Sequence, residues 1–243
     1  MRLVSFSSTL RCAAAGLLLV CASATNASAS AFTYSFSNTV QSARLDAQVS
    51  GSNLIITLTN TSIEDPSTPT EILTGVFFDI AGDPTLNALS AAICQGCSVT
   101  GGGLTDANGG VGGEWAYKSA TDLAFGAIYG ISSTGLSLFG PKDIFGGTSF
   151  SKNPPNGLGY GITTTNDKSA NNNGGMGVPL IMNSVVFTFS GVPQGFDPST
   201  AITNVTFQYG TALNELTVAE PATLPLLVVG IVFLATYRQK RTA

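Results

Sequence analysis

Apolar and polar residues alternate along short stretches of the chain, and this period of two predicts β-strands. The alternation is clearest in 32–37 (FTYSFS). There Phe32, Tyr34 and Phe36 fall on one face of the predicted strand, and small polar residues fall on the other. The strand is therefore expected to carry its aromatic side chains on a single face.

Turn-forming residues separate further stretches of this kind. The segment 53–62 (NLIITLTNTS) is rich in β-branched residues and follows a Gly51-Ser52 turn signal, so together with 45–49 it predicts a hairpin. Additional strands are predicted at 72–80, 113–120, 123–131, 135–140, 182–191 and 201–210.

No amphipathic helical pattern of three turns interrupts these strands between residues 32 and 217. Many short strands separated by Gly, Pro, Asn and Ser turns favour an all-β fold, an antiparallel β-sandwich or jelly roll. The low-complexity stretch 153–177 is poor in apolar residues and is predicted to be a mobile surface loop. The sequence thus predicts one β-sandwich domain over 32–217.

The start of the chain has a different pattern. Two arginines precede an apolar run over 13–22 that is too short to span a membrane, and small residues follow it. This order is typical of a secretory signal peptide, so residues 1–31 are expected to be removed on export. Two overlapping Ala-Ser-Ala motifs fit the small-x-small cleavage rule. Cleavage after Ala31 is favoured, and cleavage after Ala29 is the alternative.

A second apolar run closes the chain. Residues 224–237 are 14 positions without a charge, and a helix of that length reaches ~21 Å against ~30 Å of bilayer hydrocarbon. Local bilayer thinning and snorkelling of basic side chains can accommodate the mismatch, so a short transmembrane helix is predicted over 222–237. The positive-inside rule places the tail 238–243 in the cytoplasm. The cations of this tail are Arg238, Lys240 and Arg241.

The residues that lead into this apolar run resemble a known processing signal. They read Val218-Ala219-Glu220-Pro221-Ala222-Thr223. With the Leu-rich run and the basic tail behind it, this hexapeptide is similar to the PEP-CTERM sorting signal, which usually begins Val-Pro-Glu-Pro-Ala-Thr/Ser. Ala219 stands where the signal has its first proline. The resemblance covers 218–243, and an ordinary single-pass membrane anchor is the alternative.

This resemblance implies a route and a location. PEP-CTERM proteins of Gram-negative bacteria are exported and handed to an exosortase, a membrane protease or transpeptidase, so an exosortase is the implied partner. The precursor is expected to be held in the inner membrane, and the product is expected at the cell surface or in the extracellular matrix of a biofilm. The segments LIITLTNTS and ILTGVFFDIAG are also similar to parts of exosortase-dependent surface proteins.

Charge and composition narrow the function further. Between residues 32 and 220 there are five basic and 14 acidic side chains, a net charge of −9. A body this acidic repels phosphate backbones, so nucleic acid is not expected as a partner. The chain has no histidine, the commonest general base and metal ligand. No phosphate-binding loop, dinucleotide fingerprint or nucleophile elbow is present, so neither an enzymatic activity nor a cofactor is predicted.

Cys94 and Cys97 are the cysteines that remain once the signal peptide has left. An exported compartment is oxidising, so a disulfide between them is predicted. A thiol-redox site is the alternative, but such motifs sit at helix N-termini, and the Ser-Val-Thr-Gly-Gly-Gly run that follows is a poor helix start. A tetrahedral zinc site would need further Cys or His ligands, and no metal site is predicted.

Several acidic residues have both a functional and a structural interpretation. The run from Asp106 to Gly109 resembles part of a calcium loop, but Glu114 does not lie at the required spacing, so a Gly-rich turn is favoured. Asp79 and Asp83 could be a pair of catalytic carboxylates. A glycine and a proline beside them favour a turn instead.

Trp115 and Tyr117 bear on the choice of function. They could form a glycan-stacking platform, whereas a lone Trp in a sandwich is more often a core residue. The sequence favours a non-enzymatic, exported surface or matrix protein that is sorted by its C-terminal signal. The alternative is a carbohydrate-binding or adhesin-type module, with extracellular polysaccharide as its partner, held by an ordinary single-pass anchor.

Overall fold

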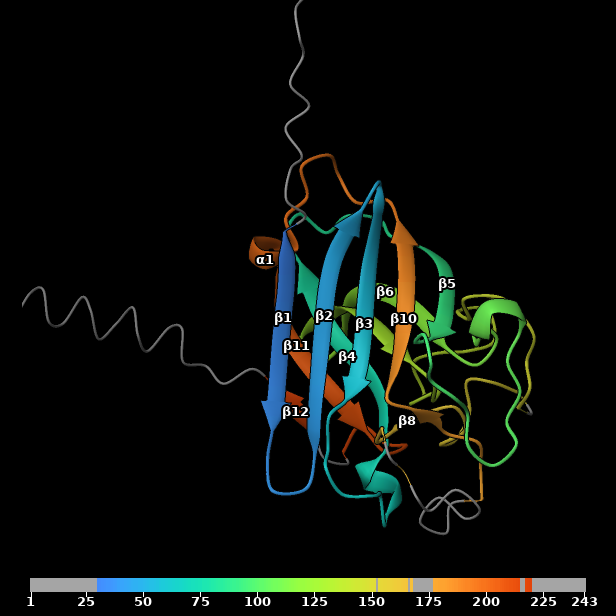
Figure 1. Cartoon of the computed structure of the whole chain (residues 1–243). Helices are drawn as coiled ribbons and strands as arrows, with labels where there is room; N and C mark the ends of the chain where they lie inside the picture. The colour runs from blue at the N-terminus through green and yellow to red at the C-terminus, as the bar shows by residue number, and fades with distance from the viewer. Residues whose placement is uncertain (1–29, 152, 166, 168–176, 215–216, 220–243) are drawn as a thin grey trace, which may run out of the picture.

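The computed structural model describes residues 30–151, 153–165, 167, 177–214 and 217–219. Within these residues the chain forms two β-sheets and only a few turns of helix. Figure 1 shows the sheets as two layers, one in front of the other. The prediction of an all-β fold is confirmed.

Five antiparallel strands make the first sheet. In spatial order they are β1 (Ala31–Ser37), β2 (Ser42–Ser50), β3 (Asn53–Asn60), β10 (Ser184–Ser190) and β5 (Asn87–Ile93). The predicted hairpin joins β2 to β3. Ser50 pairs with Asn53 across its turn, where Gly51 takes a φ of 63° that favours glycine.

The second sheet lies behind the first in Figure 1. Its main strands, in spatial order, are β12 (Thr217–Ala219), β11 (Ile202–Tyr209), β4 (Leu73–Ile80), β7 (Ala127–Ser132) and β6 (Ala116–Ala124), all antiparallel. Two short strands extend this sheet. Strand β8 (Ile162–Thr163) pairs with β4, and β9 (Ile181–Met182) pairs with β8 in parallel. The helical turns η1 (Pro69–Glu71), η2 (Ala107–Gly109) and α1 (Pro198–Ala201) lie in the connections.

Buried aromatic side chains join the two sheets. Trp115, directly before β6, is fully buried, and its ring meets Phe187 of β10 edge-on with centroids 5.1 Å apart. Tyr34 of β1 stacks on Phe207 of β11 at 5.7 Å. All three aromatic residues of β1 pack against this core, so the face predicted for 32–37 is the inner face of the strand.

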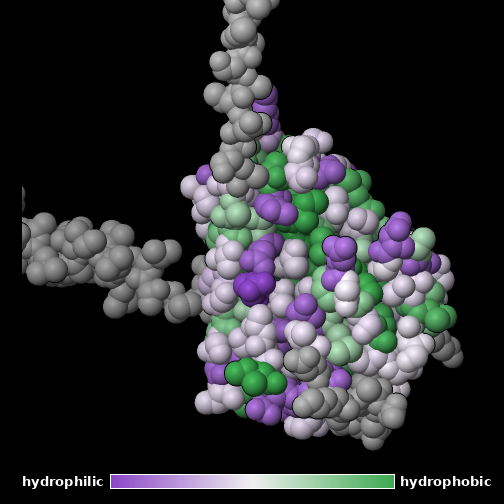
Figure 2. All heavy atoms as spheres, in the orientation of Figure 1, coloured by the Kyte–Doolittle hydropathy of each residue, from purple (hydrophilic) through white to green (hydrophobic). Residues whose placement is uncertain are grey.

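The outer face of the first sheet meets solvent. Figure 2 shows polar residues interspersed with separate apolar ones over the side of the molecule that carries this sheet. Asp46 of β2 accepts a hydrogen bond from the Thr33 hydroxyl at 2.8 Å and forms an ion pair with Arg44 at 2.7 Å. Exposed pairs of this kind contribute little stability. The stability of the sheet therefore comes from its inner face.

A smaller apolar cluster lies on the outer face of the second sheet. Phe77 of β4 packs there with Leu123 of β6 and with Leu136 and Phe139 from the connection that follows β7. Gly130 of β7 lies beneath them, and a Cβ at this position would be 2.9 Å from three of these side chains. The connection thus closes over the sheet only because residue 130 has no side chain.

Most of the predicted strands are present with shifted ends, but the prediction of a strand at 135–140 is wrong. The N–H groups of Leu138 and Phe139 both donate to the Gly135 carbonyl at 2.8 Å, which makes this segment a tight turn. Strand β5 was not predicted, because its sequence NALSAAI lacks the β-branched and aromatic pattern on which the other assignments rest.

The prediction of a surface loop over 153–177 is wrong for its first half. Tyr160 is 1% exposed, and its hydroxyl donates to the Leu104 carbonyl at 2.9 Å. Ile162 is fully buried in β8, opposite Leu73 of β4. The segment has few apolar residues, but two of them, Tyr160 and Ile162, belong to the core. Residues 168–176 lie outside the described residues.

The structure includes only the inner margins of the two terminal signals. Strand β1 begins at Ala31, and β12 contains Val218 and Ala219 of the sorting hexapeptide. Residues 1–29, and with them most of the predicted signal peptide, lie outside the described residues, as do 220–243 with the predicted transmembrane helix and the basic tail. In the part of the chain that is described, no helix has the length and apolar character needed to cross a membrane.

Candidate functional site

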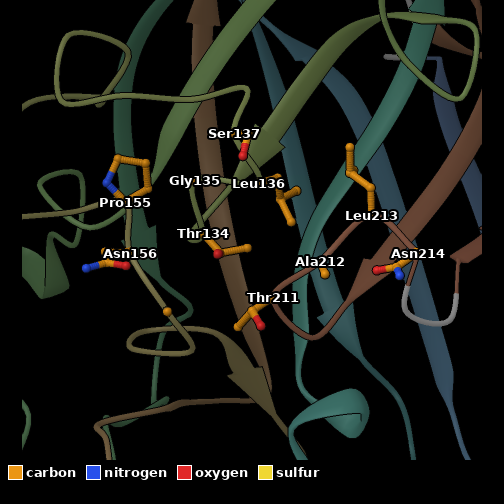
Figure 3. A pocket seen from close by; sticks show the side chains of 11 residues that line it. Thr134, Gly135, Leu136, Ser137, Pro155, Asn156, Thr211, Ala212, Leu213 and Asn214 are labelled. Atoms are coloured by element: carbon orange, nitrogen blue, oxygen red, sulfur yellow. The ribbon is translucent and has the colours of Figure 1, made fainter.

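A surface pocket of about 740 Å³ opens where three loops meet. The loops are 134–137 after β7, 155–157 before β8, and 211–214 between β11 and β12. Figure 3 shows side chains from all three loops around a common space. The polar side chains of the lining are Thr134, Ser137, Asn156, Thr211 and Asn214.

Local backbone geometry shapes the first of these loops. Leu136 and Ser137 take φ values of 49° and 59°, a left-handed conformation that costs non-glycine residues energy. The turn is stabilised because the Leu136 side chain is buried in the outer apolar cluster. Gly135 makes a close approach possible, since a Cβ there would be 3.1 Å from the Pro155 carbonyl oxygen. Packing therefore holds the loops together.

Buried polar groups fasten the third loop to the sheet. The Gln208 amide of β11 donates to the Ala212 carbonyl at 2.9 Å, and the Thr74 hydroxyl of β4 donates to the Gly210 carbonyl at 2.6 Å. Gln208 is fully buried, and its Oε1 atom finds no hydrogen-bond partner among the described residues. The loop that leads to β12 is thus tied to the two strands beneath it.

The lining chemistry suits a neutral ligand. Among the described residues, none of the lining carries an ionisable side chain, and hydroxyl and amide groups alternate with the apolar side chains of Leu136, Pro155 and Leu213. Hydroxyls and amides can both donate and accept hydrogen bonds, and the apolar side chains can contact C–H surfaces. This combination fits a polyhydroxylated molecule better than an ion or a purely apolar ligand.

The structure joins Cys94 and Cys97 in a disulfide, with their Cα atoms 5.1 Å apart, in the turn after β5. The Asn183 amide lies 3.5 Å from the sulfur of Cys94 and 3.7 Å from that of Cys97. The segment that follows contains no helix until η2. The cysteines therefore close a turn. They do not lie at the start of a helix, where redox motifs have their thiol pKa values lowered.

Asp106 of the calcium-loop motif and the nearby Glu114 both accept hydrogen bonds from backbone N–H groups of the fold. Asp106 accepts a hydrogen bond from the Thr148 N–H at 2.8 Å. Hydrogen bonding from the Thr148 side chain, followed by this bond from its N–H, holds the pKa of Asp106 below the usual range. Glu114 is 1% exposed and accepts bonds from the N–H groups of Phe150 and Ser151. Among the described residues, no three acidic, Cys or His side chains form a group that could hold a metal ion.

Asp79 and Asp83 were considered as a catalytic pair, but both carboxylate oxygens of Asp79 are engaged in hydrogen bonds within the fold. Its Oδ1 atom accepts the Ile128 N–H at 2.8 Å, and its Oδ2 atom accepts the Asn204 amide at 3.1 Å. Asp83 lies in the turn after β4 with a φ of 44°. The Asp79 carboxylate thus links β7 and β11 to β4, which is a structural role.

The interpretation of Trp115 as a core residue, favoured over a glycan-stacking platform, is confirmed. This side chain is fully buried and packs on Phe187, so it offers no surface to a glycan. Tyr117 lies mostly inside the fold, where it packs edge-on against Phe189 at 4.9 Å. Burial raises the pKa of Tyr117 to about 12, so its hydroxyl stays protonated at physiological pH.

The structure places only part of the predicted processing sites. In β12, Val218 pairs with Phe207 and Ala219 pairs with Thr206 of β11. Ala31 opens β1, while Ala29 lies outside the described residues. The rest of the hexapeptide lies outside them as well, and so do the cations of the tail. These are Glu220, Pro221, Ala222, Thr223, Arg238, Lys240 and Arg241.

The pocket could not be predicted from the sequence. Its residues are Gly, Ser, Thr, Asn, Pro and Leu from three separate loops, and these types are common in turns of any function. The two consecutive left-handed residues are visible only in the structure. Comparison with protein-family models, with curated proteins and with solved structures found no match to this chain.

Proposed function

We propose that this chain is an exported, non-enzymatic surface or matrix protein that an exosortase sorts through the C-terminal signal. In this proposal the body is an antiparallel β-sandwich of jelly-roll type, preceded by a signal peptide. A short transmembrane helix over 222–237 holds the precursor in the inner membrane of a Gram-negative bacterium. The exosortase then releases the body to the cell surface or to the extracellular matrix.

The observation that carries this proposal is the position of the sorting hexapeptide relative to the last strand. Strand β12 ends at Ala219, and the Glu220-Pro221 pair follows it directly. Processing at or beyond this pair would leave every described strand in the product. Pro221 has a fixed φ and no N–H, so it cannot continue the ladder as a donor. A proline at this position therefore disfavours pairing of a strand through residue 221.

The experiment is an intact-mass measurement of the protein from a Gram-negative host that carries an exosortase. The expected product lacks the residues after about Glu220. In the same host without the exosortase, the C-terminus should extend to Ala243. Pro221→Ala is expected to reduce processing, while Pro193→Ala, at an exposed proline of the body, should leave it unchanged. If the C-terminus extends to Ala243 even in the host that carries the exosortase, the proposed sorting is wrong and the C-terminal segment is an ordinary membrane anchor.

A second candidate function is that of a carbohydrate-binding module, and the pocket of three loops favours it. The pocket is lined by hydroxyl and amide groups without charge. Binding can be measured by pull-down on a neutral glucan, with acidic alginate as the comparison. Asn156→Ala and Asn214→Ala should each weaken retention on the glucan, while Asn87→Ala, at an exposed site in β5, should not. Equal retention of all three variants would remove the pocket from consideration.

A further inference from the structure

The beginning of the described chain is fastened to the segment before β11. The Ser30 hydroxyl donates to Asp197 Oδ1 at 2.5 Å and lies 3.4 Å from the Ser199 hydroxyl. Ala31 follows it and opens β1, where it pairs with Gln48 of β2. Ser30 and Ala31 therefore both make contacts of the folded body. Cleavage after Ala31, which the sequence alone favours, would remove both.

Asp197 is held in place by its own turn. It precedes α1, and its Oδ1 atom accepts the Ser199 N–H at 2.9 Å and the Ser199 hydroxyl at 2.7 Å. The hydrogen bonds from Ser30 and then from Ser199 hold the pKa of Asp197 below its usual range. The carboxylate is therefore negatively charged at neutral pH.

Among the residues that the structure places around Asp197, none is basic. A hollow of about 860 Å³ lies between the β2–β3 turn and the segment 192–197, with Ser30 at its border. Of the described residues that line it, Asp197 alone has an ionisable side chain. Within the described part of the chain, the ion pair that the structure forms is Arg44–Asp46, on the outer face of the first sheet. A cation that reached Asp197 would meet one uncompensated carboxylate.

We propose that export cleaves the Ala29–Ser30 bond, so that the mature chain begins at Ser30 with its α-ammonium paired to Asp197. This inference rests on the proposed export. In the cleavage, water hydrolyses the amide: the C–N bond breaks, hydroxide adds to the Ala29 carbonyl carbon, and the Ser30 nitrogen gains hydrogen. The free amine takes up a further proton at neutral pH, because its usual pKa is about 8.

The geometry separates two cleavage sites that the sequence rule does not. The new ammonium belongs to the same residue as the hydroxyl that already bonds Asp197, so cleavage before Ser30 creates a cation beside a fixed anion. Cleavage after Ala31 would leave Phe32 at the terminus, delete the Ser30 donor and remove the Ala31–Gln48 pair. The first site completes a contact of the fold, and the second one destroys it.

The first test is mass spectrometry of the N-terminal peptide of the full chain exported by a Gram-negative host. A mature chain that begins at Ser30 supports the inference. A chain that begins at Phe32 overturns it and leaves the proposed export intact. A chain that retains Met1 or the apolar run 13–22 contradicts the export itself, so the two failures are distinguishable.

The second test measures the pKa of the α-amine in the exported protein by NMR after selective isotopic methylation. In the wild type the pKa should lie about one unit above its usual value, because an adjacent opposite charge favours the ammonium. Asp197→Asn should abolish this shift, while Glu64→Gln, at an exposed carboxylate elsewhere, should preserve it. An α-amine pKa that is the same in the wild type and in Asp197→Asn overturns the ion pair.

Discussion

Carboxylates of this protein accept hydrogen bonds from backbone N–H groups in the loops. Asp106 accepts the Thr148 N–H, Asp143 accepts the Gly140 N–H at 2.8 Å, and Glu114 accepts two N–H groups of the 150–151 segment. Loop N–H groups have no ladder partner, so a nearby carboxylate satisfies them with a charge-assisted bond. The acidic residues thus contribute to loop structure in addition to net charge.

Asp106→Asn is expected to make the protein less sensitive to acid. The pKa of Asp106 is lowered in the folded state from an ordinary value of 3.8, chiefly by the hydrogen bonds from Thr148. Its contribution to stability is therefore present above that ordinary value and is lost as the pH falls through the folded value. The amide does not titrate, so the thermal midpoint should drop less between pH 7 and pH 3.

The matched control for this measurement is Glu64→Gln, which removes an exposed carboxylate in the connection after β3. This variant should lose as much thermal stability in acid as the wild type. If Asp106→Asn also shows the wild-type drop, the bond to Thr148 does not contribute to the acid sensitivity.

At the scale of elements, the strands of the second sheet depend on the connections that cover them. The segment after β7 folds back so that Leu136 and Phe139 pack on Phe77 of β4. The apolar pattern of 135–140 predicted a strand. These residues instead form a turn, and their apolar side chains pack against the second sheet. The buried residues of this turn, Leu136 and Phe139, are three positions apart, so the structure does not keep the spacing of two that a strand would have.

Gly130→Ala is expected to lower the free energy of unfolding by about 1–3 kcal/mol. The added methyl group would lie 2.9 Å from the side chains of Leu123, Phe139 and Phe77, so at least one of them must move. Chemical denaturation measures the effect. Gly140→Ala is the matched control, since its Cβ would meet only the Asp143 carboxylate at 4.0 Å. Equal stability of the two variants would contradict the close packing at Gly130.

At the scale of the whole molecule, the core between the sheets joins segments from both halves of the chain. Phe187 of β10 contacts Trp115 and also Phe145, whose ring centroid lies 5.3 Å away. Strand β3 pairs with β10 across more than a hundred residues of sequence. The two sheets therefore form one cooperative unit, because neither can bury its inner face without the other.

Phe187→Ala is expected to destabilise the protein by about 3–5 kcal/mol, because it leaves a cavity at the centre of the core. Urea unfolding should remain a single transition with a lower midpoint. Val40→Ala, at a side chain that is 54% exposed, should change the midpoint little. If Phe187→Ala lowered the midpoint as little as Val40→Ala does, the core around position 187 would have collapsed to fill the cavity.

The sequence by itself determined the fold class and most of the strands, and it predicts the two processing signals. These are local properties: alternation in 32–37, β-branched runs such as 53–62, and charge and apolar length at the ends. The face of β1 was predictable because a strand exposes alternate residues whatever its partner is. Strand β5 was not, since small residues such as those of NALSAAI have no strong preference of their own.

Only the tertiary structure decided which distant segments meet. It brings together the three loops of the pocket around Thr134, Asn156 and Thr211. It also places Ser30 on Asp197 across 167 positions of the chain. Neither contact has a local signature, because each forms only when burial of the common core fixes both partners in space. That is the physical reason why the contact between Ser30 and Asp197 could not be predicted from the sequence.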